Sequence, residues 1–270
     1  MTAPRALAAA QIVPIRGDVG ANLAAHVRAI HAAASEGARV LVFPELSLTG
    51  YELDLGERLA FTADDARLAP LRDLATAKQI TLVVGAPVRL GEKLHIGAFL
   101  LSADGAIDVY TKHHLGAFSA DANLGGPIPP PESDAFVPGD RNPLVHFDGH
   151  TAAVAVCADI HGAPHAGNAA RRGASTYLAG MFVIPAHLEF DLLRLRDIAT
   201  KHAMAVVFAN FGGPTGGLPA AGGSAILSPS GEVLVQLPPS GSGIAIATDT
   251  TETVETEAGW RAKTILLDAP

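Results

Sequence analysis

The chain has 270 residues, of which 49% are apolar and 17% charged, which is typical of a compact globular protein and excludes an intrinsically disordered one. The formal net charge of −8 and the absence of a Lys/Arg-rich block exclude a nucleic-acid surface, because phosphate binding needs clustered positive charge. No apolar run is long enough to span a bilayer, and the single cysteine excludes an intrachain disulfide and favours a reducing, cytoplasmic location.

Short apolar runs alternate with segments of helical period along the chain, which predicts an α/β layered protein. The helical period appears around Leu23–Ala34, Leu68–Ala75 and Leu192–Ala199. No repeat or linker marks a boundary, so we expect one domain over residues 1–270, with a core at about 7–247 and a C-terminal tail at 248–270. The predicted strands are 6–13, 39–43, 81–88, 94–101, 106–111, 144–147, 151–157, 175–180, 204–210, 223–228, 232–237 and 243–248.

One long segment, residues 114–140, fits neither pattern, because it is rich in Gly and Pro and has no sustained period. A loop of this length inside a compact domain is usually either disordered or functional. We expect its fold to shape the pocket of any site nearby.

Three of the predicted strands end in chemically reactive side chains. RVLVFPE places Glu45 just past one strand, AIDVYTK places Lys112 just past another, and TAAVAVC places Cys157 at the end of a third. In open α/β sheets, ligands bind beyond the carboxyl ends of the strands. Each residue alone also has an ordinary structural explanation, but together the three predict one active site.

The three groups have complementary chemistry. A thiol is a strong nucleophile only as the thiolate, so Cys157 needs a proton acceptor and a positive neighbour. Glu45 can be the acceptor, because burial raises the pKa of a carboxylate towards the range useful for acid–base catalysis. Lys112 can stay charged and stabilise an oxyanion.

A Cys–His pair is the competing mechanism, since histidine can also take the proton of a thiol. His161 and His165 have the i, i+4 spacing of a zinc pair, but Gly162 and Pro164 disfavour a regular helix between them, so no metal site is indicated. The histidines available to the cysteine are His113, His114, His161 and His165.

The segments FPELSLTGY, YTKHHL and VAVCAD, in that order, resemble the three signature regions of the nitrilase superfamily, also called carbon–nitrogen hydrolases. The resemblance extends from about Leu7 to Ala247. ESDAFVPGD is similar to the family segment that carries an additional active-site glutamate, here Glu132, and VVFANFGG and GGSAILSPSGEVL resemble later structural strands of the family.

The resemblance implies a four-layer α-β-β-α sandwich that pairs through helices next to the active site into a homodimer or a higher homo-oligomer. It also implies cofactor-free hydrolysis of a small linear amide. Cys157 would attack the carbonyl, and Lys112 and the backbone N–H of Ala158 would hold the oxyanion. Glu45 would be the general base, and Glu132 would position substrate or nearby groups.

The sequence departs from the family pattern after the cysteine. True nitrilases typically show Cys-Trp-Glu, whereas this chain has Cys157-Ala158-Asp159, which weighs against nitrile substrates. HGAPHAG replaces the usual Arg-aromatic-Pro stretch, so that wall of the pocket is expected to be unusual.

Asp159 and His187 are the predicted substrate contacts. Arg171 and Arg172 could also hold a substrate carboxylate, although solvated surface charge is the simpler interpretation. Two alternatives to the amidase stay open: an N-carbamoyl amidohydrolase, and a catalytically silent member that binds a ligand or a partner surface. Glu45, Lys112, Cys157 and Glu132 are all retained, which argues against the silent member.

Overall fold

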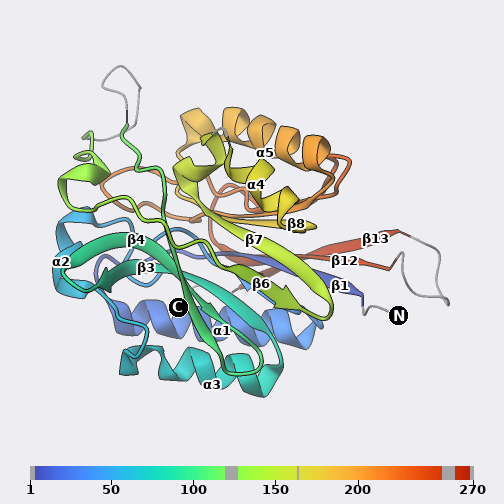
Figure 1. Ribbon diagram of the computed structural model, residues 1–270, viewed down its shortest axis with the longest axis horizontal. Helices are drawn as coiled ribbons and strands as arrows, with labels where there is room; N and C mark the ends of the chain where they lie inside the picture. Colours follow the sequence, from blue (N-terminus) through green and yellow to red (C-terminus); the bar gives the residue numbers. More distant parts are fainter. Residues whose placement is uncertain (1–3, 119–126, 163, 251–258, 268–270) are drawn as a thin grey trace.

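The computed structural model describes residues 4–118, 127–162, 164–250 and 259–267. Two β-sheets face each other, and helices cover the outer face of each sheet (Figure 1). The predicted α-β-β-α sandwich is therefore confirmed. In the part of the chain that the structure describes, no helix is both long and apolar enough to cross a membrane.

The first sheet has seven strands in the order β13-β12-β1-β2-β3-β4-β5. Its centre is parallel, because β2 pairs in parallel with both β1 and β3, while the remaining pairs are antiparallel. The strands are β1 (Arg5–Gln11), β2 (Val40–Val42), β3 (Thr81–Leu90), β4 (Lys93–Leu101), β5 (Ile107–Thr111), β12 (Ser242–Asp249) and β13 (Trp260–Leu267).

The second sheet has six strands in the order β11-β10-β9-β8-β7-β6. Strands β7, β8 and β9 are parallel, so their carboxyl ends lie at one edge of the sheet. The strands are β6 (Leu144–Phe147), β7 (His150–Val156), β8 (Thr176–Gly180), β9 (Ala205–Ala209), β10 (Ala225–Leu227) and β11 (Val233–Gln236).

The longer helices cover the sheets in pairs. α1 (Val19–Ser35) and α3 (Ala69–Lys78) lie on the first sheet, and α4 (His165–Arg171) and α5 (Leu188–His202) lie on the second (Figure 1). The Asp18 side chain caps α1 by accepting a hydrogen bond from Ala21 N. The short helices are α2 (Gly56–Leu59), η1 (Leu53–Leu55), η2 (Ala66–Leu68), η3 (Glu132–Asp134), η4 (Cys157–His161) and η5 (Pro185–His187).

Besides the short helices, two elements are absent from the sequence prediction. Residues 260–267, placed in the C-terminal tail, form β13, which pairs with β12 over its whole length. Its side chains are mostly exposed, so the apolar pattern that marks a buried strand is missing. Helix α4 is the other element, and its seven residues, HAGNAAR, are too few to show a helical period.

The core between the sheets is filled by small side chains. In β1, Leu7, Ala8, Ala9 and Ala10 are all fully buried, although their side chains alternate between the two faces of the sheet. Alanines on a central strand allow the helices and the second sheet to approach closely.

Candidate active site

Glu45 begins a tight turn three residues after β2 ends at Val42. Leu46 has a positive φ of 52°, and the turn packs against glycines of both sheets. A Cβ atom at Gly85 would lie 2.3 Å from the Pro44 carbonyl oxygen, and one at Gly180 would lie 2.5 Å from the Phe43 carbonyl oxygen. Only glycine fits at these two positions, and together they fix the backbone that carries Glu45.

Lys112 follows β5, and its backbone N–H donates to Ile96 O of the neighbouring strand at 2.8 Å. The side chain is fully buried and runs into the same site as Glu45. Its Nζ donates to Glu45 Oε1 at 2.6 Å and to Glu132 Oε1 at 2.7 Å. One ammonium group therefore bridges two buried carboxylates.

Glu132 begins η3 in the long segment that the sequence leaves without a secondary structure. Its Oε1 also accepts the Tyr51 hydroxyl at 2.7 Å, and its Oε2 accepts Gly116 N at 2.7 Å. The Glu132 backbone N–H in turn donates to Gly116 O. Residues 119–126 of this segment lie outside the described residues, but the side chain of Glu132 is held from three directions.

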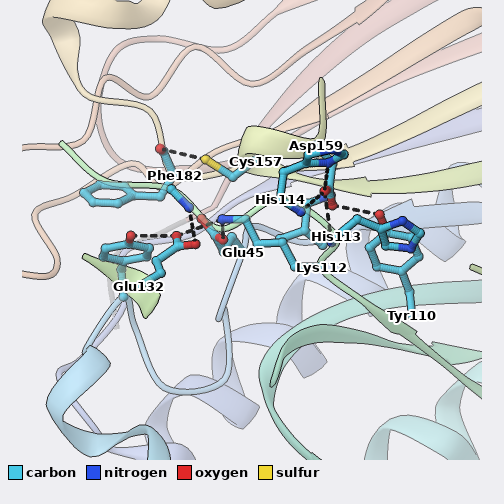
Figure 2. A network of polar contacts seen from close by, with 12 residues as sticks. Glu45, Tyr110, Lys112, His113, His114, Glu132, Cys157, Asp159 and Phe182 are labelled. Atoms are coloured by element: carbon cyan, nitrogen blue, oxygen red, sulfur yellow. Dashed lines mark hydrogen bonds and ion pairs between the residues drawn. The ribbon is translucent and has the colours of Figure 1, made fainter. Parts of the chain in front are cut away.

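Cys157 is the first residue of η4, directly after β7, and has a positive φ of 45° that is uncommon for a residue with a side chain. Such strain is stored where the surroundings hold the residue firmly, often at functional sites. Cys157 is partly exposed as a residue, but its thiol is buried and donates to Phe182 O at 3.7 Å. Figure 2 shows it beside the Glu45–Lys112–Glu132 group.

The surroundings of Glu45 and Cys157 raise the pKa values of both groups. Burial raises the pKa of Glu45 to about 7, although Lys112 acts in the opposite direction. Burial and the negative charge of Glu45 raise the pKa of the Cys157 thiol well above its ordinary value, and the opposing effect of Lys112 is smaller. The thiol is therefore protonated at neutral pH and needs a base, the role that the sequence predicts for Glu45, whereas the expected lowering of the thiol pKa by Lys112 is outweighed.

Lys112 remains charged despite its position. Burial alone lowers the pKa of its ammonium group, but the negative charges of Glu45, Cys157 and Glu132 raise it above the ordinary value. Glu45 Oε2 is buried and has no hydrogen-bond partner among the described residues. A buried acceptor of this kind can receive a proton from a group that approaches it.

Asp159 does not have the place that we expected for a substrate contact. It is fully buried, and both carboxylate oxygens accept hydrogen bonds from the protein. Oδ1 accepts from His113 N, His114 N and His114 Nδ1, and Oδ2 accepts from Tyr110 OH and Val156 N. These hydrogen bonds occupy the acceptor positions of Asp159, which argues against the prediction that it contacts substrate.

The other predicted contacts lie at different depths. His187 is half-buried at the start of α5, and its ring stacks on Phe118 with centroids 6.3 Å apart. Ala158 follows the cysteine in η4 and is partly exposed. Arg171 and Arg172 are exposed at the end of α4, as surface charges are.

The four histidines of the competing mechanism have other partners. His161 pairs with Asp191 Oδ1 at 2.9 Å, and His165 lies between two tyrosine hydroxyls. The rings of His113 and His114 lie on the Asp159 side of the site, where His113 stacks on Tyr110 (Figure 2). Among the described residues, no group of three or more His, Cys, Asp or Glu is placed to hold a metal ion.

Three aromatic rings beside the thiol escaped the sequence reasoning. Phe182 packs on Tyr51 with centroids 4.8 Å apart and on Phe118 at 6.0 Å. Tyr51 stands in the FPELSLTGY segment and Phe182 comes two residues after β8, so their positions relative to strand ends could have indicated them. They give the site an apolar wall.

The comparisons with known proteins agree with this geometry. A family model described as carbon–nitrogen hydrolase matches residues 6–256. The chain therefore belongs to the carbon–nitrogen hydrolase family, which confirms the resemblance seen in the signature segments.

The relatives include amidases. A mutant of the amidase from Nesterenkonia sp. AN1, solved in complex with butyramide, has a TM-score of 0.78 and 27% identity, with 89% of each chain covered. The chloroplastic omega-amidase of Arabidopsis thaliana is 28% identical over 82% of this chain and 61% of its own length. A glutamine-dependent NAD(+) synthetase of Thermotoga maritima is 28% identical over 83% of this chain, but the match spans only 38% of that protein.

Proposed function

We propose that the protein is a cysteine-dependent hydrolase that cleaves the C–N bond of a small linear amide through a thioester, releasing ammonia or an amine. The observation that carries this proposal is the buried Lys112 ammonium between Glu45 and Glu132, beside the strained Cys157. This arrangement places a nucleophile, a base and a fixed positive charge together.

The first half of the reaction follows from the proton affinities. Glu45, with a pKa of about 7, takes the proton of the thiol as Cys157 attacks the amide carbonyl carbon. The oxyanion that forms is stabilised by Lys112 and the backbone N–H of Ala158. Glu45 then gives the proton to the leaving nitrogen, and the thioester remains on Cys157.

In the second half, Glu45 takes a proton from water as the water attacks the thioester carbonyl, and it returns that proton to the sulfur as the C–S bond breaks, which releases the carboxylic acid and restores the Cys157 thiol. Glu132 keeps Lys112 in position throughout, since it shares the ammonium with Glu45. A small acyl group is favoured by the aromatic wall of Tyr51, Phe118 and Phe182. The omega-amidase and the butyramide-binding amidase among the relatives support amides of this size.

We also propose that the protein acts in a reducing, cytoplasmic compartment as a homodimer or larger homo-oligomer. Helix α5 supports the assembly, because Phe190 and Leu193 are 65% and 51% exposed on it. Large apolar side chains at such exposure are typical of a contact surface.

The test is an ammonia-release assay over short aliphatic amides, ω-amides of dicarboxylic acids, N-carbamoyl compounds and nitriles, with Cys157→Ala as the control. We expect release from an amide and none from the control, together with an acyl adduct on Cys157 by mass spectrometry. Release of carbon dioxide with the ammonia would assign the N-carbamoyl alternative. Binding without release from any of these compounds would favour the silent member.

A further inference from the structure

A chain of buried hydrogen bonds lies behind the nucleophile and takes no part in the reaction proposed above. The Tyr177 hydroxyl lies 2.7 Å from His165 Nδ1, His165 Nε2 lies 2.9 Å from the Tyr110 hydroxyl, and that hydroxyl donates to Asp159 Oδ2 at 2.7 Å. The four side chains come from β8, α4, β5 and η4. All four are buried.

The neutral form of His165 fixes the protons of the chain, because burial lowers the pKa of its imidazole to about 4. Tyr110 has one hydroxyl hydrogen, which Asp159 Oδ2 accepts, so the Tyr110 oxygen must accept the N–H of His165 Nε2. His165 Nδ1 then accepts the hydroxyl hydrogen of Tyr177. A neutral imidazole carries one N–H, so His165 can donate on one side of the chain and accept on the other.

Asp159, at the end of this chain, joins the two segments that carry the nucleophile and the lysine. On one side it accepts Val156 N, the residue before Cys157, at 3.1 Å. On the other side it accepts His113 N at 3.0 Å and His114 N at 2.8 Å, directly after Lys112. Figure 2 shows the carboxylate between the two segments.

We propose that Asp159, fixed by Tyr110, His165 and Tyr177, is a positioning residue that holds the strained turn of Cys157 in register with the Lys112 segment. Tyr110 stands in β5, two residues before Lys112, and Asp159 stands in η4, two residues after Cys157. The strained backbone at Cys157 persists only if its surroundings over-determine it, and the Asp159 bonds to three backbone N–H groups do so. This role rests on the proposed function.

The simpler alternative is that the chain only satisfies buried polar groups, which would contribute to stability alone. The two roles differ in what happens at the thiol. If the chain positions the turn, loosening it lets water reach the thiol, and the pKa of Cys157 falls towards its ordinary value, because burial is the main cause that raises it. If the chain is purely structural, breaking it lowers the melting temperature and leaves the pKa of the thiol in the folded protein unchanged.

The experiment measures the iodoacetamide alkylation rate of Cys157 against pH, with kcat and KM on the best amide, in Asp159→Asn, Tyr110→Phe and Tyr177→Phe. Tyr110→Phe removes one hydroxyl and keeps the ring. In this variant we expect the midpoint pH of alkylation to fall. We also expect kcat to fall on the order of 10- to 100-fold with little change in KM, which is the loss that a misplacement of about 1 Å can cause. Tyr177→Phe, one link further away, should show the same changes to a smaller extent.

The control is Ser228→Ala, which removes a buried hydroxyl just after β10. Ser228 follows Leu227, which pairs with Val206 near the start of β9. Gly180, which packs behind Glu45, pairs with Ala209 at the other end of β9, so the control lies away from the site. A lower melting temperature in Tyr110→Phe with a wild-type alkylation profile would overturn the positioning role, and so would an equal shift in Ser228→Ala. If Asp159→Asn fails to fold, Tyr110→Phe decides. If the wild type hydrolyses no amide, the proposed function fails while the alkylation profile still tests the positioning.

Discussion

Lys112 Nζ donates to Glu45 Oε1 across 2.6 Å, and neither side chain is exposed to solvent. Removing one member of such a pair leaves an uncompensated buried charge. In this site the destabilisation is larger, because Glu132 shares the same ammonium. Without Lys112, the carboxylates of Glu45 and Glu132, which are 0% and 1% exposed, would be left together with no positive charge between them.

Replacement of Lys112 by the uncharged Met should therefore abolish turnover and lower the free energy of unfolding by about 3–5 kcal/mol. The loss should be greater at pH 8 than at pH 5, because the two carboxylates can relieve their repulsion by binding protons. Urea unfolding at the two pH values measures it. The control Lys263→Met removes an exposed pair with Glu36 and should change stability by less than about 1 kcal/mol.

The pH dependence of kcat/KM should report Glu45. A general base acts when it has lost its proton, so the rate should rise about tenfold per pH unit below a midpoint near 7 and then level off. Glu45→Gln should lose this limb. A midpoint close to 4.5, the ordinary value for a glutamate, would contradict the assignment of Glu45 as the base.

The same shift in pKa affects stability. Native Glu45 keeps its proton up to about pH 7, whereas in the unfolded chain it is released near 4.5. Between these values the native state binds more protons, so the contribution of Glu45 to stability falls as the pH rises. Glu45→Gln should remove this part of the decrease in a urea-unfolding series from pH 4.5 to 7.

The two glutamates should fail differently when each is changed to Gln. Glu45→Gln loses the proton transfer and should lower kcat on the order of 10²- to 10⁴-fold. Glu132→Gln keeps the shape and one acceptor oxygen, so it should retain a measurable rate with a changed KM. Steady-state kinetics of both variants decide, and an equal collapse would mean that Glu132 also transfers protons. Tyr51→Phe, which removes only the hydroxyl bond to Glu132, should have the mildest effect.

The glycine contacts behind Glu45 can be tested by adding one methyl group. Gly85→Ala brings a Cβ atom to 2.6 Å from Leu46 N, so the turn must move or the strand must distort. We expect a loss of about 1–3 kcal/mol in stability, as for other overpacked sites, together with a lower kcat. Gly20→Ala, in the first turn of α1, meets no atom closer than 3.5 Å and should be neutral or stabilising.

The exposed side chains of α5 should determine the assembly. Phe190→Ser combined with Leu193→Ser should shift the protein towards a smaller species in analytical ultracentrifugation, because both side chains are mostly exposed in the single chain. Leu266→Ser is the matched control, since Leu266 is 68% exposed on the edge strand β13. An unchanged sedimentation coefficient in the double variant would place the contact elsewhere.

The sequence by itself determined which groups stand at the ends of strands. Glu45, Lys112 and Cys157 could be found because each follows an apolar strand, although β2 and β5 lie in the first sheet and β7 in the second, so only the facing of the two sheets brings them together. The layers were predictable for the same reason, since buried strands and amphipathic helices carry strong periodic patterns. Edge strand β13 carries no such pattern because its side chains face solvent.

Only the tertiary structure decided what each group bonds to. Glu132 meets Tyr51 across 81 positions of sequence, and Tyr110 meets Asp159 across 49, so no local pattern could indicate either contact. The protonation of the thiol is likewise a property of the folded site, because burial and Glu45 raise the pKa of Cys157 more strongly than Lys112 lowers it. Residue type sets which proton transfers are possible, whereas desolvation and distance, which exist only after folding, set their direction.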